Sequence, residues 1–290
     1  LEENKKFNKE TLINLINNYE KYFVQENIKK FHLLDKTDNY SDPVFLIGFP
    51  RSGTTLLDTI LRTHSKTFVL EEKPYISLIR DEFFKSNNNL ISALENIKFN
   101  ELKKIRQNYF ANIKKISNNN SSEIIIDKLP LNIIEIGFIK RIFPKSKFIL
   151  MLRHPCDSVL SCFVTDFNIN EAMVHFLNID DAAKLYSRVF NLWNQFTKVL
   201  KIQFHIIKYE KVITHFDETI NNLLNFLEIN WEDNLRNFNK TAIERNRIKT
   251  PSYNQVINPL NTSSIGRWKN YDKMKNIENK LGEWIEFFKY

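Results

Sequence analysis

The stretch "VFLIGFPRSGTTLL" (44–57) runs from an apolar strand into a glycine-containing loop and then into the start of a helix. Gly48 and Gly53 have the spacing of a phosphate-binding loop, which presents backbone N–H groups and the positive end of a helix dipole to an anion. A nucleoside triphosphatase carries lysine followed by serine or threonine after the second glycine, whereas this chain has Thr54 and Thr55. We therefore predict an oxyanion site that lacks the usual lysine; the alternative is a plain structural turn.

The cation inside this loop is Arg51, and it is the only one there. We expect it to supply the positive charge that the missing lysine would supply in a nucleoside triphosphatase. Hydroxyl groups of Ser52, Thr54 and Thr55 and the backbone of Gly53 complete the expected set of anion contacts.

A second cation follows another apolar run, because the stretch 147–155, "KFILMLRHP", places Arg153 directly after a predicted buried strand. Nucleoside triphosphatases hold Mg²⁺ with an acidic residue at such a strand end. A cation there repels Mg²⁺ and attracts a second anion, and Ser161, about two helical turns along, could add a hydroxyl group. The alternative is that Arg153 forms an ordinary surface ion pair. Two anion sites without a metal ligand predict a nucleotide with phosphates at both ends of its ribose.

Strand-like and helical patterns alternate along most of the chain. This alternation predicts an α/β protein with a P-loop-type three-layer fold: a central parallel sheet of about five strands, flanked by helices on both faces. The predicted strands are 44–49, 66–70, 123–127, 146–152 and 202–209. The predicted helices are 54–63, 98–116, 132–142, 179–200, 216–228 and 272–289. We expect an irregular stretch between about 230 and 265, and a polar helical segment at 1–40 before a main domain at 41–290.

Composition limits the partners and the location of the protein. The formal net charge of +8 suits an anionic ligand, although lysine, asparagine and isoleucine are abundant throughout, as codon bias can produce. No apolar run approaches 18 residues, so we expect no membrane span. Two cysteines, Cys156 and Cys162, make neither a disulfide framework nor a zinc pattern, which favours a reducing compartment and a cytoplasmic location. The chain begins without methionine or a signal-peptide pattern.

Five segments in order resemble the PAPS-dependent sulfotransferases, in particular the branch of tyrosylprotein sulfotransferases and their bacterial relatives that carry TPR repeats. The segments are "PRSGTTLL" (50–57), "LRHPCDSVLSCF" (152–163), "IKYEKVI" (207–213), "INPLN" (257–261) and "SSIGRWKNY" (263–271). The resemblance covers most of the chain from residue 43 to about residue 271. It implies sulfuryl transfer from PAPS, 3′-phosphoadenosine 5′-phosphosulfate, to an acceptor hydroxyl with release of PAP and without a metal. It is also compatible with residues 1–40 being a remnant of a longer N-terminal region, although one helical unit does not establish this.

The resemblance also implies catalytic residues. Glu72 matches the family's general base, which removes the acceptor proton, although its neighbour Glu71 could be confused with it and both could be solvated or cap a helix. Lys128 matches a lysine that stabilises charge on the transferred group and on the leaving oxygen. Ser252 matches a serine that contacts the reacting group. Asp127, beside Lys128, is interpreted as a structural cap.

Further nucleotide contacts are expected near the end of the chain, where Arg267 and Trp268 fit a lid that supplies a cation and an aromatic surface. Tyr209 is either a nucleotide contact or a core residue at a strand end. Arg245 or Arg247 could line the 3′ side of the nucleotide, with a surface loop as the alternative.

The acceptor is expected to carry a hydroxyl group, as in protein tyrosine, a glycan or a small molecule. Pro74 and Leu78 stand where the tyrosylprotein enzymes have basic residues that bind acidic peptides, so specificity for acidic peptides is not expected. No nucleic-acid partner is expected, and a homodimer is compatible with the sequence. Two other functions remain as alternatives, namely a P-loop kinase or nucleoside triphosphatase and a non-enzymatic binder of anions or nucleic acid.

Overall fold

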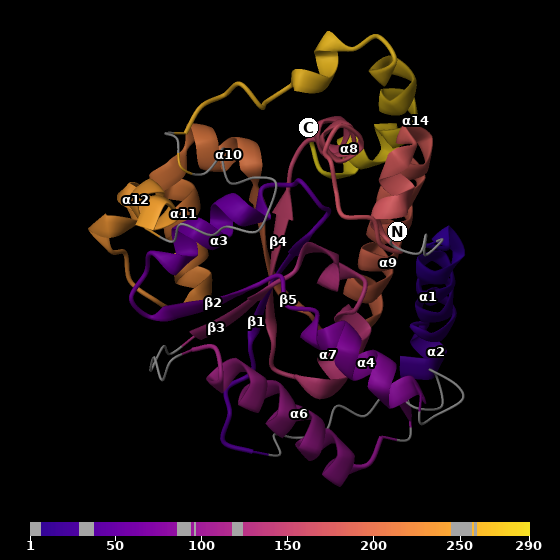
Figure 1. Ribbon diagram of the computed structural model, residues 1–290, viewed down its shortest axis with the longest axis vertical. Coiled ribbons are helices and arrows are strands. Elements are labelled where there is room, and N and C mark those ends of the chain that lie inside the picture. The colour runs from indigo at the N-terminus through magenta and orange to yellow at the C-terminus, as the bar shows by residue number, and fades with distance from the viewer. Residues whose placement is uncertain are drawn as a thin grey trace, which may run out of the picture.

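Five parallel strands form the centre of the molecule in the computed structural model (Figure 1). The structure describes residues 7–28, 38–85, 94–95, 97–117, 124–244, 257 and 260–290. The strands are β1 (Val44–Gly48), β2 (Thr67–Glu71), β3 (Ile124–Lys128), β4 (Lys147–Leu152) and β5 (Gln203–Lys208). Their order across the sheet is β2-β3-β1-β4-β5, and every neighbouring pair is parallel. The predicted fold class is confirmed, and each strand boundary lies within one residue of its prediction.

The central strands β1 and β4 are buried on both faces, which explains why they read as continuous apolar runs. All five residues of β1 are buried. Phe45 and Ile47 belong to one hydrophobic cluster, whereas Val44 and Leu46 belong to the other. Successive side chains of a strand point to opposite faces, so one apolar segment fills both cores.

Helices cover the sheet on both sides (Figure 1). The face that receives Val44 and Leu46 is covered by α3 (Thr54–Arg62), α10 (Tyr209–Thr214), α11 (Phe216–Leu227), η3 (Asp233–Asn237) and α12 (Phe238–Glu244). The other face is covered by α1 (Lys9–Tyr22), α4 (Tyr75–Lys85), α6 (Phe99–Lys114), α7 (Ile136–Ile142), α8 (Pro155–Phe163), α9 (Ile179–Val199) and α14 (Met274–Phe287). Short elements complete the described chain: α2 (Gln25–Ile28), η1 (Pro130–Ile133), η2 (Met173–Leu177) and η4 (Arg267–Asn270).

Two helical predictions need correction. The stretch 230–265, expected to be irregular, contains η3 and α12, because Leu235, Phe238 and Ala242 at helical spacing pack into the core beside α3. The helix expected over 132–142 is α-helical only from Ile136, because a 3₁₀ turn begins at Pro130, which suits the first position of a helical turn.

The first described helix, α1, packs against α9 and joins the core of the main unit (Figure 1). Ile16, Tyr19 and Tyr22 are fully buried on its inner face. The Tyr19 hydroxyl donates a hydrogen bond to Glu135 Oε2 at 2.7 Å, next to the start of α7. The N-terminal helix is therefore part of the scaffold that holds the sheet, whose carboxyl edge carries the predicted site.

Candidate active site

The loop after β1 turns sharply before α3 begins. The Ser52 N–H donates to the Phe49 carbonyl at 3.2 Å, and both Arg51 (φ 66°) and Gly53 (φ 103°) lie in the left-handed region. Gly53 cannot be replaced easily, since a Cβ there would lie 2.7 Å from Cδ2 of the Tyr209 ring. Arg51 adopts the same region at a cost of roughly 1–2 kcal/mol. This turn brings the loop close to the ring of Tyr209.

The hydroxyl-bearing residues of the loop and of the first turn of α3 are buried. Ser52 is 1% exposed, and Thr54 and Thr55 are also buried. Ser52 Oγ is buried and has no hydrogen-bond partner among the described residues. The first N–H groups of a helix also have no partner within the helix. Hydroxyl and backbone N–H donors therefore gather at the start of α3, as an anion site requires.

Arg51 and Arg153 lie close together at the carboxyl edge of the sheet. Arg51 Nε donates to Ser161 Oγ of α8 at 3.1 Å, and Arg153 Nη1 donates to the Arg51 carbonyl at 3.3 Å. Burial lowers the pKa of the Arg51 guanidinium, and the positive charge of Arg153 lowers it further. An anion bound between these two cations would relieve their repulsion.

Arg153 is 8% exposed and has neutral partners only, among the residues that the structure describes. Besides the Arg51 carbonyl, it donates to the carbonyl of Ser264 and lies 5.2 Å from the centre of the Tyr209 ring. Its Nε is buried and has no hydrogen-bond partner in the described part of the chain. A buried guanidinium that forms no ion pair among the described residues can form charge-assisted hydrogen bonds with an anionic ligand.

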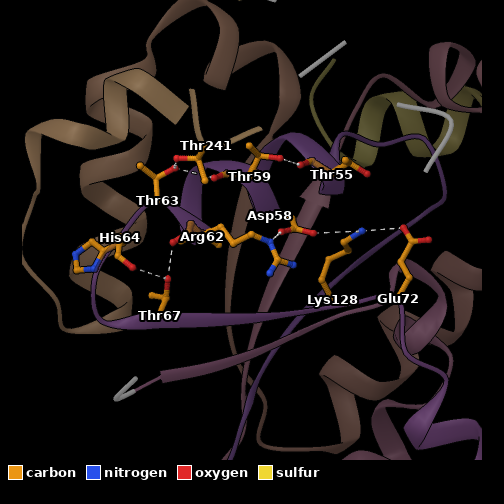
Figure 2. A network of polar contacts seen from close by, with 11 residues as sticks. Thr55, Asp58, Thr59, Arg62, Thr63, His64, Thr67, Glu72, Lys128 and Thr241 are labelled. Atoms are coloured by element: carbon orange, nitrogen blue, oxygen red, sulfur yellow. Dashed lines mark hydrogen bonds and ion pairs between the residues drawn. The ribbon is translucent and has the colours of Figure 1, made fainter. Parts of the chain in front are cut away.

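Glu72 and Lys128 meet at the ends of β2 and β3. The strands pair Glu71 with Lys128, and the Glu72 N–H donates to the Lys128 carbonyl at 2.8 Å. The Lys128 ammonium donates to Glu72 Oε1 at 2.8 Å (Figure 2). Lys128 is completely buried, whereas the Glu72 side chain is 37% exposed and can reach a substrate. Of the two neighbouring glutamates, Glu72 is the one that contacts Lys128.

Glu72 also has an unusual backbone conformation, with a φ of 45°. A non-glycine residue in this region is uncommon and is held there by its surroundings. The hydrogen bond from its N–H to the end of β3 provides part of that restraint. The turn carries Glu72 out of β2 and sets its carboxylate against Lys128.

The segment expected to form a lid lies against the N-terminus of α8. Asp157 accepts hydrogen bonds from the N–H groups of Gly266 at 2.7 Å and Trp268 at 3.0 Å. Trp268 is buried and stacks on His154, with ring centres 5.2 Å apart. Its indole N–H is buried without a partner among the described residues. Arg267 is exposed at the start of η4.

The structure thus brings most of the predicted residues together at one edge of the sheet. Arg51 follows β1, Glu72 follows β2, Lys128 ends β3 and Arg153 follows β4. The predicted Ser252, like Arg245 and Arg247, lies outside the described residues. No cluster of histidine, cysteine, aspartate or glutamate that could hold a metal ion occurs within the described ranges.

Tyr209 begins α10 at the end of β5 and is half-buried between the loop and Arg153. Its ring would collide with a side chain at Gly53 and faces the guanidinium of Arg153. Burial raises the pKa of its phenol, although Arg153 and a hydrogen bond with Ser264 oppose this. Tyr209 therefore packs between the loop and the guanidinium of Arg153.

Sequence reasoning missed two acidic residues that organise the site. Asp58 lies in α3 and is completely buried, 3.5 Å from the Lys128 ammonium (Figure 2). Asp157 connects α8 to the C-terminal segment. Asp58 stands four residues before Arg62, a spacing that signals a helical ion pair but not its burial.

The fold and this edge define a P-loop-type α/β protein with a site rich in buried cations. A family model described as "Sulfotransferase family" matches residues 43–233. The chain belongs to the sulfotransferase family. Among the described residues no helix is long and apolar enough to cross a bilayer.

Three relatives illustrate the range of similarity. A protein of Aquifex aeolicus (strain VF5) is 28% identical over 242 residues, which cover 80% of this chain and 31% of that protein. Protein-tyrosine sulfotransferase 2 of Gallus gallus is 23% identical over 233 residues, 78% of this chain and 62% of that one. Protein-tyrosine sulfotransferase of Drosophila melanogaster is 23% identical over 270 residues, 86% of this chain and 50% of that one. The chain thus spans between 31% and 62% of the length of these relatives.

Two solved structures share the fold. The sulfotransferase domain from the curacin biosynthetic pathway superposes with a TM-score of 0.55 at 18% identity, covering 84% of this chain and 99% of that domain. The sulfotransferase domain of the Synechococcus PCC 7002 olefin synthase gives 0.56 at 17% identity, covering 88% and 98%. At these identities the likeness concerns the fold alone.

Proposed function

We propose that this chain is an enzyme that transfers a sulfuryl group from PAPS to an acceptor hydroxyl and releases PAP. The observation that carries the proposal is the contact of Lys128 with Glu72, beside a loop whose cation is Arg51. This places a carboxylate able to accept a proton next to an ammonium and an anion cradle. Membership of the sulfotransferase family supports the same reaction class.

The two arginines, with neighbouring hydroxyl groups, would bind the two anionic ends of PAPS. The loop N–H groups, Ser52, Thr54, Thr55 and Arg51 would hold the 5′-phosphosulfate. Arg153 and Ser161 would hold the 3′-phosphate, as the resemblance implies. The hydrogen bond between Arg51 and Ser161 joins the two halves of this site, so the two anionic ends of one nucleotide would satisfy both cations.

The chemical step is a displacement at sulfur. The acceptor oxygen forms a bond to sulfur while the bond from sulfur to the 5′-phosphate oxygen breaks and leaves its electron pair on PAP. The Glu72 carboxylate accepts the proton of the acceptor hydroxyl, a role that contributes roughly 10²–10⁴-fold to rate. The Lys128 ammonium stabilises the negative charge that develops on the leaving oxygen.

The remaining contacts are proposed from the resemblance. Ser252 would contact the reacting group, and Arg267 and Trp268 would cover the nucleotide, with Tyr209 beneath it. The buried indole N–H of Trp268 is a donor that a ligand could use. Cys156 and Cys162 are free and buried, which supports a reducing, cytoplasmic location.

The acceptor is proposed as a hydroxyl-bearing molecule of the protein-tyrosine, glycan or small-molecule class. The names of the Gallus gallus and Drosophila melanogaster relatives favour protein tyrosine. Against an acidic peptide, Pro74 and Leu78 stand where the resemblance would place basic residues, and Leu78 is 56% exposed. We therefore expect acceptors to be selected by shape and apolar contact more than by negative charge.

Binding and transfer assays test this proposal together. PAP should raise the melting temperature of the protein in the presence of EDTA, whereas Mg-ATP should raise it much less. Labelled PAPS should then transfer its sulfuryl group to at least one member of a panel of phenols, tyrosine peptides and glycans. Stabilisation by Mg-ATP alone would favour a kinase or nucleoside triphosphatase. Binding only to nucleic acid, with steep salt dependence, would favour a non-enzymatic binder. Either result would overturn the proposal.

A further inference from the structure

Lys128 has a second carboxylate partner on the side away from Glu72. Its ammonium lies 3.5 Å from Asp58 Oδ2, and both side chains are 0% exposed (Figure 2). At this distance the contact is an ion pair and not a close hydrogen bond. The buried cation therefore sits between one fully buried carboxylate and one carboxylate that reaches the surface.

The second carboxylate matters when Glu72 is neutralised. In the proposed reaction Glu72 takes the acceptor proton and loses its negative charge, so it no longer balances Lys128. A buried ammonium without a counter-ion is strongly disfavoured and tends to lose its proton. Lys128 would then lack the charge that the leaving oxygen requires.

We propose that Asp58 is a positioning residue that keeps Lys128 charged and aimed at the reacting group while Glu72 takes up the proton. This inference rests on the proposed function, because it concerns the same site. Asp58 is completely buried on the side of Lys128 away from Glu72, so it lies out of reach of the acceptor and keeps its contact with Lys128 while Glu72 takes the proton. Glu72 is thereby free to change its protonation state.

Arg62 orients the Asp58 carboxylate from the next turn of α3. Arg62 Nε donates to Asp58 Oδ1 at 2.6 Å, which leaves Oδ2 on the side of Lys128 (Figure 2). Each oxygen of Asp58 thus faces a different cation. With Glu72 included, cations and carboxylates alternate along one line from α3 to the end of β2.

An ordinary structural role would give different results. In a purely structural role, the i, i+4 pair of Asp58 and Arg62 would only stabilise α3. In that case the loss of Arg62 would equal the loss of Asp58, and neither would act through Lys128. A structural role and a positioning role of Asp58 therefore predict different effects of Asp58 and Arg62 substitutions on kcat.

The test compares Asp58→Asn with the parent enzyme. We expect kcat to fall about 10–100-fold, the range found when an outer partner of a site residue is lost. KM for PAPS and the Kd for PAP should change less than about threefold, since Asp58 does not touch the nucleotide. Arg62→Gln should lower kcat less than Asp58→Asn does. The matched control is Asp217→Asn, which breaks the exposed pair with Arg236 and should leave kcat unchanged.

A double-mutant cycle shows whether Asp58 acts through Lys128. In a Lys128→Gln background, Asp58→Asn should cause no further loss of turnover. An undiminished loss in that background, an unchanged kcat in the single variant, or a loss in Arg62→Gln as large as in Asp58→Asn would each overturn the inference.

A measurement that leaves Asp58 intact covers the case in which Asp58→Asn does not fold. In Glu72→Gln, a ¹⁵N NMR spectrum should still show the Lys128 ammonium at neutral pH, assigned by its absence in Glu72→Gln/Lys128→Gln. Loss of the ammonium proton in Glu72→Gln would overturn the role of Asp58. If the parent binds no PAP and transfers no sulfuryl group, the proposed function fails, whereas the NMR result judges the Asp58 inference independently.

Discussion

Two buried arginines, Arg106 in α6 and Arg153 after β4, differ in their partners. Arg106 is 2% exposed and donates to the carboxylates of Asp38 at 2.9 Å and Asp42 at 2.7 Å, and to the Ile142 carbonyl. Arg153 is 8% exposed and donates only to backbone carbonyls among the described residues. The first cation forms ion pairs within the protein, whereas the second forms none among the described residues, which suits its proposed role in binding a phosphate.

The difference distinguishes structural charges from charges available for binding. A buried ion pair with complete hydrogen bonding holds two segments together, whereas removal of one partner leaves an unpaired buried charge. Arg106 joins α6 to the segment before β1 in this way. Arg153 instead bonds carbonyl groups of the loop and of the C-terminal segment, and it forms no ion pair among the described residues. The predictions below test this division at both places.

The largest effect is expected at Glu72, which is paired with a buried cation, as the partners of Arg106 are, and is also exposed to a ligand. Glu72→Gln should reduce turnover by roughly 10²–10⁴-fold, because the amide cannot accept the acceptor proton. PAP binding, measured by calorimetry, should stay within about threefold of the parent. Equal turnover in the variant and the parent would remove Glu72 from the role of base.

The second-largest effect is expected at Arg106, which is paired with two carboxylates. Arg106→Met should destabilise the protein by about 3–5 kcal/mol, because Asp38 and Asp42 remain buried without their cation. Urea unfolding measures this change, and the folded fraction should bind PAP as the parent does. A loss of PAP affinity without a loss of stability would contradict the structural role of Arg106.

Arg153→Ala should lower the affinity for PAP and leave the stability nearly unchanged, the opposite of what is expected for Arg106→Met. The affinity for PAP should fall about 10–100-fold, the equivalent of one hydrogen bond to a charged group. Stability without ligand should change little, because no carboxylate loses its partner. Arg236→Ala, at the exposed pair with Asp217, is the matched control and should leave the affinity unchanged. An unaltered affinity in Arg153→Ala would place the 3′-phosphate elsewhere.

The smallest effect concerns Asp127, next to Lys128 but on the other face of the sheet. Tyr109 donates to its carboxylate at 2.8 Å, and burial raises the pKa of Asp127 to about 7 in spite of this hydrogen bond. The folded protein therefore holds this proton more tightly than the unfolded chain, whose carboxyl has its ordinary pKa of about 3.9. Stability should fall as the pH rises from about 4 to about 7, by at most about 1.4 kcal/mol per unit, and then level off.

Asp127→Asn removes this titration. The difference in unfolding free energy between parent and variant, measured by urea unfolding from pH 4 to pH 8, should shift in favour of the variant as the pH rises. A difference that is constant over this range would show that Asp127 titrates alike in both states. Turnover of the variant relative to the parent should depend on pH less than its stability does, because Asp127 faces away from Glu72.

The sequence allowed the sheet to be predicted closely, because a strand covered on both faces must be apolar at every position, as β1 is. The anion-binding loop could also be predicted from the sequence, because glycines and hydroxyl-bearing residues at a fixed spacing precede a helix. α12 was missed, because its apolar positions are few and its burial depends on α3. Asp58 was missed because a carboxylate four residues before an arginine usually marks an exposed helix face.

The sequence by itself determined where the strands end, and that Arg51 and Arg153, which follow two of them, would come to one edge of a parallel sheet. That follows from local periodicity and from the rule that parallel strands share their carboxyl edge. Glu72 and Lys128 were added to this edge by the resemblance to the family. Only the tertiary structure decided which carboxylate faces which cation. Asp58 meets Lys128 and Asp157 meets the C-terminal segment because α3 and α8 pack against strands far away in sequence. Such long-range pairing depends on packing, which no local pattern encodes.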